Sequence, residues 1–162
     1  MDALHVENVE QLVTVEAVKQ LKYRYLRTLD LKRWDEFAAL FVPDATGDYG
    51  GSLAFSSRDE LVDYMRTNLG PDVLTQHHCH HPEIDLVDED HATGRWYLED
   101  RVLVPDARFV LEGAAFYDDR YVRTVDGWLI EHTGYRRTYE ATYSMDDLPG
   151  YRLTVGTAYA GG

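Results

Sequence analysis

The sequence predicts an α+β domain, with three helices in the first half of the chain and an antiparallel sheet in the second. Apolar residues near the N-terminus recur at intervals close to 3.6 residues, which is typical of an amphipathic helix. From about residue 75 onward, β-branched and aromatic residues form long runs separated by turn signals. The chain of 162 residues is long enough for one domain with its own core.

The helices are predicted from periodicity and from end signals. The first covers residues 9–29 and carries apolar side chains at Val9, Leu12, Val13, Ala17, Leu21, Tyr25 and Leu29. A short helix is expected over 34–41, because Pro43 disfavours a longer one. A third helix follows Ser56 or Ser57, either of which can cap it, and ends at Gly70-Pro71.

Four strands in meander order are expected to follow, over residues 75–87, 91–104, 109–124 and 127–141. Turn signals separate them at Asp88–Asp90, Pro105-Asp106 and Asp126-Gly127. The pair Asp118-Asp119 is also interpreted as a turn. Residues 1–140 are predicted to form the domain, and residues 141–162, with weak patterning, an arm or a lid.

Charge and composition exclude several classes of partner. The net charge of -13 argues against binding to nucleic acid or to an anionic membrane. A lone cysteine, Cys79, rules out an internal disulfide and is typical of a reducing compartment. The N-terminus lacks the pattern of a signal peptide, and no apolar run approaches the roughly 20 residues of a membrane helix. We therefore expect a cytoplasmic protein.

Asp100 interrupts the apolar face of its predicted strand. That face is otherwise formed by Ala92, Gly94, Trp96, Leu98, Val102 and Val104. Burying a carboxylate costs several kcal/mol unless it is paired or protonated. Asp100 is therefore expected in a polar cavity or in an altered protonation state, as acid–base sites require. The alternative is a β-bulge at Glu99 or Asp100 that turns the carboxylate outward.

Four histidines and the cysteine occupy positions 77–81. A regular strand would divide them between its two faces, with His77, Cys79 and His81 on one and His78 and His80 on the other. Strict alternation with the apolar Ile84 and Leu86 would turn the second set inward. Pro82, however, is typical of an edge or a bulge, and one bulge reverses the order. Periodicity alone does not select the inward histidine.

A metal site is not expected from this tract. The side chains from His77 to His81 span about 13 Å at ~3.3 Å per residue, too far for one ion unless the strand folds back. Neither CxxC nor HExxH is present. The sequence predicts neither a metal nor another cofactor.

A resemblance appears in the segments "YRYLRTLDLKRWDEFAALFVPDA", "HHCHHPEIDL", "ATGRWYLED" and "DDRYVRTVDGWLIEHTGYRRTYE". Together with the predicted order of elements, they resemble the SnoaL-like proteins, whose fold is similar to those of nuclear transport factor, scytalone dehydratase and ketosteroid isomerase. The resemblance implies a cone in which three N-terminal helices pack on a curved, mostly antiparallel mixed sheet and enclose a cavity.

Within that superfamily the chain is most similar to the bile-acid 7-alpha-dehydratase type, which implies a set of catalytic residues. An aspartate after the first helix pairs with a strand histidine, and these match Asp30 and His77. The histidine is selected because it lies four residues before the position, here His81, where relatives often carry Asn. The other implied residues are Tyr25, Asp100 and Arg137, with Arg136 as the alternative to Arg137.

The resemblance implies a cofactor-independent lyase or isomerase acting on a hydrophobic cyclic substrate, steroid-like or polyketide-like, with dehydration favoured. In this reading His77 removes a carbon-bound proton, Tyr25 donates to an oxyanion, Asp100 protonates a leaving hydroxyl and Arg137 holds Asp100 or the substrate. The alternatives are a non-catalytic ligand-binding or assembly protein, a polyketide cyclase and a ketosteroid-type isomerase. Relatives form trimers or dimers, so a homo-oligomer is expected, with the trimer favoured.

Overall fold

The predicted α+β class is confirmed by a computed structural model, which describes residues 8–156. Its helices are α1 (Val9–Asp30), α2 (Trp34–Ala38) and α3 (Arg58–Asn68). Its strands are β1 (Phe41–Asp48), β2 (Ala54–Phe55), β3 (Leu74–Leu86), β4 (His91–Val104), β5 (Phe109–Thr124) and β6 (Gly127–Ser144), followed by a 3₁₀ turn, η1 (Met145–Asp147). The strands form one sheet in the order β2-β1-β6-β5-β4-β3.

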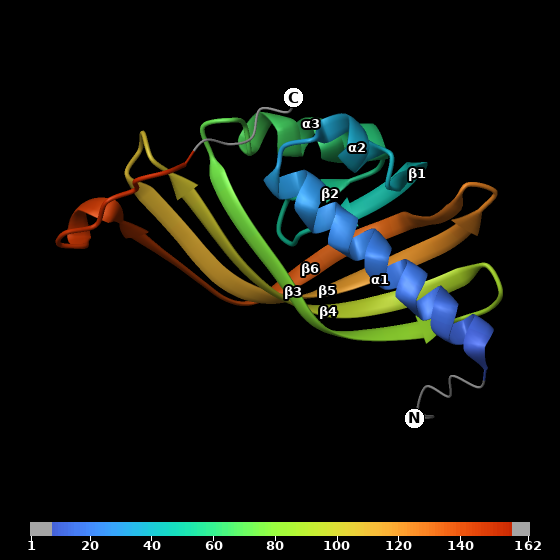
Figure 1. The fold of residues 1–162 in the computed structure, drawn as a ribbon. Coiled ribbons are helices and arrows are strands. Elements are labelled where there is room, and N and C mark those ends of the chain that lie inside the picture. Colours follow the sequence, from blue (N-terminus) through green and yellow to red (C-terminus); the bar gives the residue numbers. More distant parts are fainter. Residues whose placement is uncertain (1–7, 157–162) are drawn as a thin grey trace.

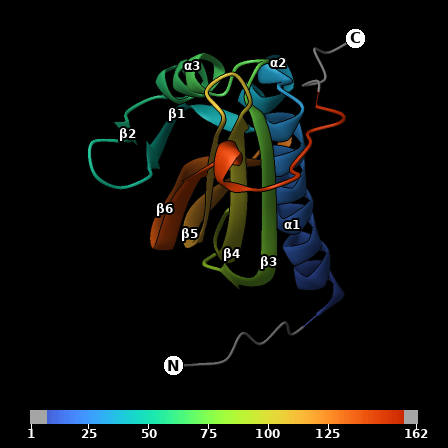
Figure 2. The same ribbon diagram turned by 90° about the vertical axis from the view of Figure 1, so that its left-hand side faces the viewer.

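The sheet is mixed and strongly curved. Strands β3 to β6 form the predicted antiparallel meander, whereas β1 pairs in parallel with β6. Helix α1 lies along the concave side beside β3, and α2 and α3 close one end of the trough (Figures 1 and 2). This is the predicted cone, and the end of α1 therefore meets the start of β3.

The predicted helices are present with adjusted ends. The side chain of Ser57, rather than that of Ser56, caps α3 by accepting a hydrogen bond from the Glu60 N–H at 3.2 Å. Helix α2 stops at Ala38 instead of continuing to residue 41, because the chain enters β1 at Phe41.

Strands β1 and β2 were not predicted from the sequence. Pro43 lies inside β1, which is unusual because proline donates no ladder hydrogen bond. The pairing of β1 with β6 shifts register between Phe41 and Thr46, so the proline falls where the ladder is interrupted. Strand β2 has only two residues and carries no periodicity that a pattern could reveal.

The C-terminal segment returns toward the helices. Strand β6 continues to Ser144, so the predicted boundary at residue 140 falls within a strand. From η1 the chain runs back toward the start of β3 (Figure 1). There Gly156 lies so close to Leu74 that an added Cβ would stand 2.7 Å from its Cδ1. A role as a lid stays a prediction, and residues 157–162 lie outside the described part.

None of the helices within residues 8–156 has the length and apolar character needed to cross a membrane.

Candidate active site

A β-bulge in β3 decides which histidine faces the concave side. His80 is opposite Tyr97 and Glu83 is opposite Arg95, so β3 has one more residue than β4 between these pairs. The extra residue is accommodated at His81, whose φ of 49° is left-handed. Because the bulge reverses the alternation, His77 and Ile84 both point inward, although they are seven positions apart and a regular strand would place them on opposite faces.

Asp30 and His77 form a tightly bonded dyad. The Asp30 Oδ1 lies 2.6 Å from the His77 Nδ1, and its Oδ2 accepts the backbone N–H of the same residue at 2.9 Å. An ionised carboxylate only accepts hydrogen bonds, so Nδ1 carries the proton and Nε2 keeps a free lone pair. Within residues 8–156, no hydrogen-bond partner occupies this Nε2. The imidazole is thus oriented as a base.

Two residues that the sequence analysis did not identify support the dyad. The Thr75 hydroxyl donates to the Asp30 Oδ1 at 2.8 Å and accepts from the Lys32 Nζ at 2.8 Å. Lys32 has a left-handed φ of 59° just after α1, where the N–H of Arg33 bonds back to the Thr28 carbonyl at 2.9 Å. A lysine in this conformation is strained, and its ammonium is thereby directed at the dyad. Burial lowers the pKa of Lys32 to about 8, although Asp30 opposes this shift.

The lowered pKa of Lys32 predicts a pH-dependent contribution to stability. Between pH 8 and the ordinary value of 10.5, the unfolded chain holds the proton that the folded chain has released. The contribution of Lys32 to the free energy of unfolding therefore rises with pH across this window. We expect the difference between wild type and Lys32→Met to increase from pH 8 to 10 in urea titrations. The control is Lys19→Met, which changes a half-buried lysine on α1. A difference between wild type and Lys32→Met that stays constant with pH would contradict the expectation.

Asp100 and Arg137 form a second pair beside the dyad. Asp100 is the cross-strand partner of His77 and is only 8% exposed, with no bulge at this point of β4. Its two carboxylate oxygens accept bonds from Arg137 Nη1 and Nη2, the second at 2.8 Å. Arg136 instead contacts Asp48 at 2.6 Å on the exposed side. Burial lowers the pKa of Arg137, but its hydrogen bonds with Asp100 outweigh this and raise it.

Gly113 provides the space for this second pair. A Cβ at this position would stand 2.8 Å from the Arg137 Nη1 and 2.7 Å from the Tyr139 carbonyl oxygen. Gly113→Ala is therefore expected to displace Arg137 from Asp100 and to cost about 1–3 kcal/mol of stability, the usual range for overpacking. Urea unfolding measures this cost. Gly70→Ala, where the nearest atom lies 3.8 Å away, is the matched control, and equal effects of the two would contradict the role of Gly113.

Tyr25 lies inside the cone, but its hydroxyl forms a hydrogen bond with another tyrosine and not with the dyad. It lies 3.0 Å from the hydroxyl of Tyr49, and the residue is fully buried. Burial raises the pKa of Tyr25, while the nearby Lys22 acts in the opposite direction. The five predicted residues thus occupy the concave side as two bonded pairs and one tyrosine that has a tyrosine partner.

A buried ion pair lies deeper in the same interior. The Lys22 Nζ, fully buried, is 2.8 Å from the Asp119 Oδ2, though not in hydrogen-bonding geometry. Asp119 also accepts hydrogen bonds from Tyr121 and Thr133, each at 2.8 Å. The ammonium stands 3.3 Å from the ring centroid of Tyr117. The interpretation of Asp118-Asp119 as a turn is wrong, since both residues are part of β5.

A family model for the SnoaL-like domain matches residues 10–134. The chain belongs to the SnoaL-like family. Uncharacterized proteins of Mycobacterium tuberculosis and Mycobacterium bovis are 30% identical to it over 115 residues, which cover 70% of this chain and 78% of theirs.

Two of the solved structures with a similar fold have names that state an enzyme activity. A candidate scytalone dehydratase of Novosphingobium aromaticivorans aligns with a TM-score of 0.77 and 25% identity, covering 82% of this chain and 89% of that one. A type 2 hexachlorocyclohexane dehydrochlorinase aligns with a TM-score of 0.76 and 18% identity. The alignment covers 84% of this chain and 93% of that one. The structural relatives of this SnoaL-like protein thus include lyases.

Proposed function

We propose that this SnoaL-like protein is a cofactor-independent lyase that removes a carbon-bound proton from a hydrophobic cyclic substrate and expels water. The main support is the Asp30–His77 dyad, in which the 2.6 Å contact at Nδ1 leaves Nε2 as the basic atom. Such an arrangement is what general-base catalysis needs, because it fixes both the ring and its tautomer. The relatedness to dehydratase and dehydrochlorinase folds agrees with this class of reaction.

The proposed reaction begins when Nε2 of His77 removes a proton from the carbon next to a carbonyl group. The electron pair of that C–H bond forms the new double bond, and the C–O bond to the hydroxyl breaks. The imidazolium returns its proton to the leaving oxygen, so the net change is the loss of one water molecule. Asp30 stabilises the imidazolium in between.

The remaining residues are assigned roles that follow from their contacts. Because burial raises the pKa of Tyr25, its hydroxyl keeps the proton and can donate a hydrogen bond to a developing oxyanion. Asp100 uses both of its carboxylate oxygens to accept hydrogen bonds from Arg137. We therefore assign Asp100 the role of positioning Arg137 for a substrate oxygen, in place of the proton donation inferred from the resemblance.

The test is incubation with a panel of cyclic hydroxy-ketones in deuterated water, followed by mass spectrometry. The panel includes 3-oxo-steroids and bile-acid derivatives, and the variants are wild type and His77→Ala. Deuterium uptake or an 18-dalton loss that requires His77 would support the proposal. Tight binding of a compound that undergoes no exchange would instead favour a non-catalytic ligand-binding protein, and uptake that persists in His77→Ala would refute the role of the dyad.

A further inference from the structure

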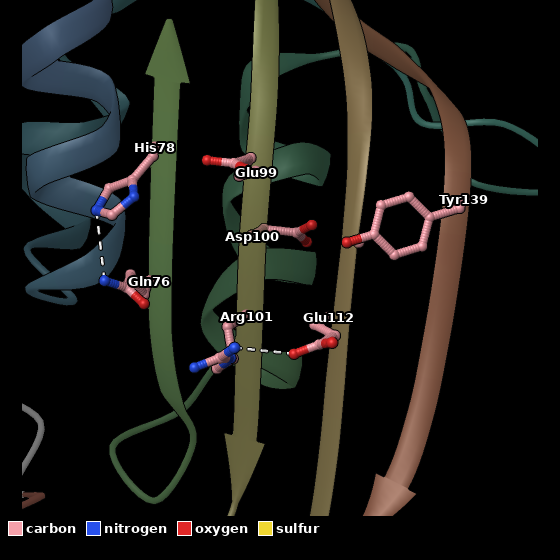
Figure 3. A pocket seen from close by; sticks show the side chains of 8 residues that line it. Gln76, His78, Glu99, Asp100, Arg101, Glu112 and Tyr139 are labelled. Atoms are coloured by element: carbon pink, nitrogen blue, oxygen red, sulfur yellow. Dashed lines mark hydrogen bonds and ion pairs between the residues drawn. The ribbon is translucent and has the colours of Figure 1, made fainter.

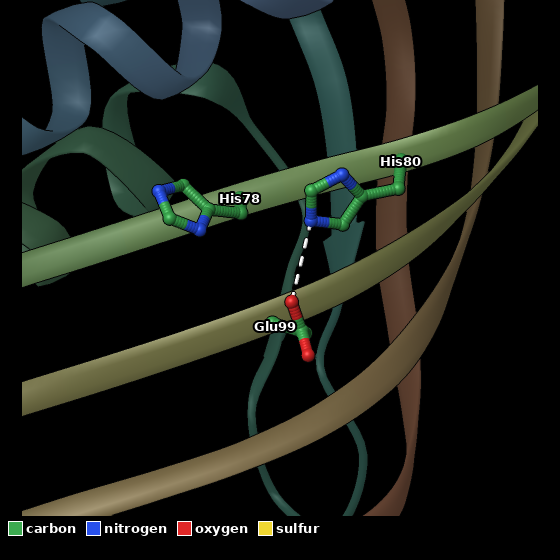
Figure 4. A group of neighbouring side chains, drawn as sticks. All are labelled: His78, His80 and Glu99. Atoms are coloured by element: carbon green, nitrogen blue, oxygen red, sulfur yellow. Dashed lines mark ion pairs between the residues drawn. The ribbon is translucent and has the colours of Figure 1, made fainter.

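The bulge at His81 also decides what lies on the outer, convex side of β3. His78 and His80 both point away from the helices, and Glu99 of β4 is the cross-strand partner of His78. Figure 4 shows the three side chains together, with His80 Nε2 at 3.3 Å from Glu99 Oε2. One candidate ligand atom from each of the three residues lies within 4.8 Å of the others. We propose that His78, His80 and Glu99 bind a divalent transition-metal ion of the Zn²⁺ class.

The distances fit such an ion. Zinc lies about 2.0–2.2 Å from nitrogen and oxygen ligands, so ligand atoms in a tetrahedral site stand about 3.4 Å apart. The contact between His80 and Glu99 is already at this separation, and no distance in the group exceeds it by more than about 1.4 Å. The side chains of His80 and Glu99 are 41% and 59% exposed, so rotation into the site meets little resistance.

The chemistry of the ligands selects the class of ion. Two imidazoles and one carboxylate suit zinc, copper or nickel, whereas magnesium and calcium prefer oxygen ligands alone. A polar pocket of about 210 Å³ adjoins His78 and Glu99 on the convex side and leaves room for water as a fourth ligand (Figure 3).

This site is separate from the dyad, because His77 points to the opposite face of the same strand. The inference therefore does not depend on the proposed function. An ion held by β3 and β4 would join the two strands next to the position where His77 and Asp100 are paired. Binding is thus expected to raise the melting temperature of the protein.

The experiment is calorimetric titration of the full chain, freed of metal with a chelator, with Zn²⁺ and separately with Mg²⁺. We expect one Zn²⁺ per chain, a higher melting temperature and no detectable Mg²⁺ binding. His78→Ala, His80→Ala and Glu99→Gln should each weaken Zn²⁺ binding at least about 10-fold, the loss that even an outer-shell partner produces. His91→Ala is the matched control, since His91 is an exposed histidine that contacts Asp88 at 2.9 Å elsewhere on the sheet.

Melting curves without metal check that each variant is folded before its affinity is interpreted. Unchanged Zn²⁺ affinity in the three variants would overturn the proposal, as would an equal loss in His91→Ala. Loss of binding in His77→Ala with retention in His78→Ala would also overturn it, since the ion would then belong to the inner face.

Discussion

Alanine in place of His77 is expected to slow turnover by about 10²–10⁴-fold, the usual contribution of a positioned base. The fold should survive, because Asp30 keeps its hydrogen bonds with Thr75 and with the backbone N–H of residue 77. Asp30→Asn is expected to lose activity as well, since an amide does not fix the tautomer or stabilise an imidazolium. The double variant should be no slower than His77→Ala alone, because the two residues act as one unit.

Steady-state kinetics on the substrate found by the screen measures these losses, and melting temperatures check the fold. His91→Ala, an exposed histidine on β4, is the matched control and should retain full activity. If the fold-losses in turnover of Asp30→Asn and His77→Ala multiplied in the double variant, the two residues would act independently. That result would contradict a dyad.

Breaking the buried pair of Lys22 and Asp119 is expected to produce the largest loss of stability. Lys22→Met leaves a buried carboxylate without its cation, and Asp119→Asn leaves a buried ammonium, which typically costs about 3–5 kcal/mol. The double variant Lys22→Met/Asp119→Asn should be less destabilised than the sum of the two single changes, because neither charge remains.

Urea unfolding gives the free energies for this comparison. The matched control is Lys19→Met in the same helix, whose partner Glu16 is exposed and lies 3.8 Å away. An exposed pair of this kind contributes at most about 1 kcal/mol. If Lys22→Met lowered the free energy of unfolding no more than Lys19→Met does, the buried pair would not stabilise the fold.

The fold could be predicted because its signals are periodic and local. The meander was placed within a few residues, since long β-branched runs are interrupted by turn dipeptides. Strand β1 was missed because it contains Pro43 and pairs with the far end of the chain, on β6. Such a pairing depends on tertiary contacts, which the sequence next to the strand does not indicate.

The candidate site was accessible to sequence analysis in part. Asp100 was found because a carboxylate on an apolar strand face breaks the pattern, and the structure places it inside and paired. The pattern left Lys22 unnoticed, because a lysine at the margin of an apolar helix stripe resembles an ordinary solvated one. The cluster of His78, His80 and Glu99 was also missed, since ligand spacing was considered along one strand, whereas this group spans two.

The bulge at His81 allows two side chains, those of His77 and Ile84, to point inward together, whereas a regular strand would place them on opposite faces. Residues before it place the imidazole of His77 against α1, and residues after it place Ile84 in the core, where it is 3% exposed. A regular strand from His77 to Ile84 would turn one of these two side chains to the solvent. The left-handed backbone at His81 is therefore as much a determinant of this strand as the histidine content of the tract.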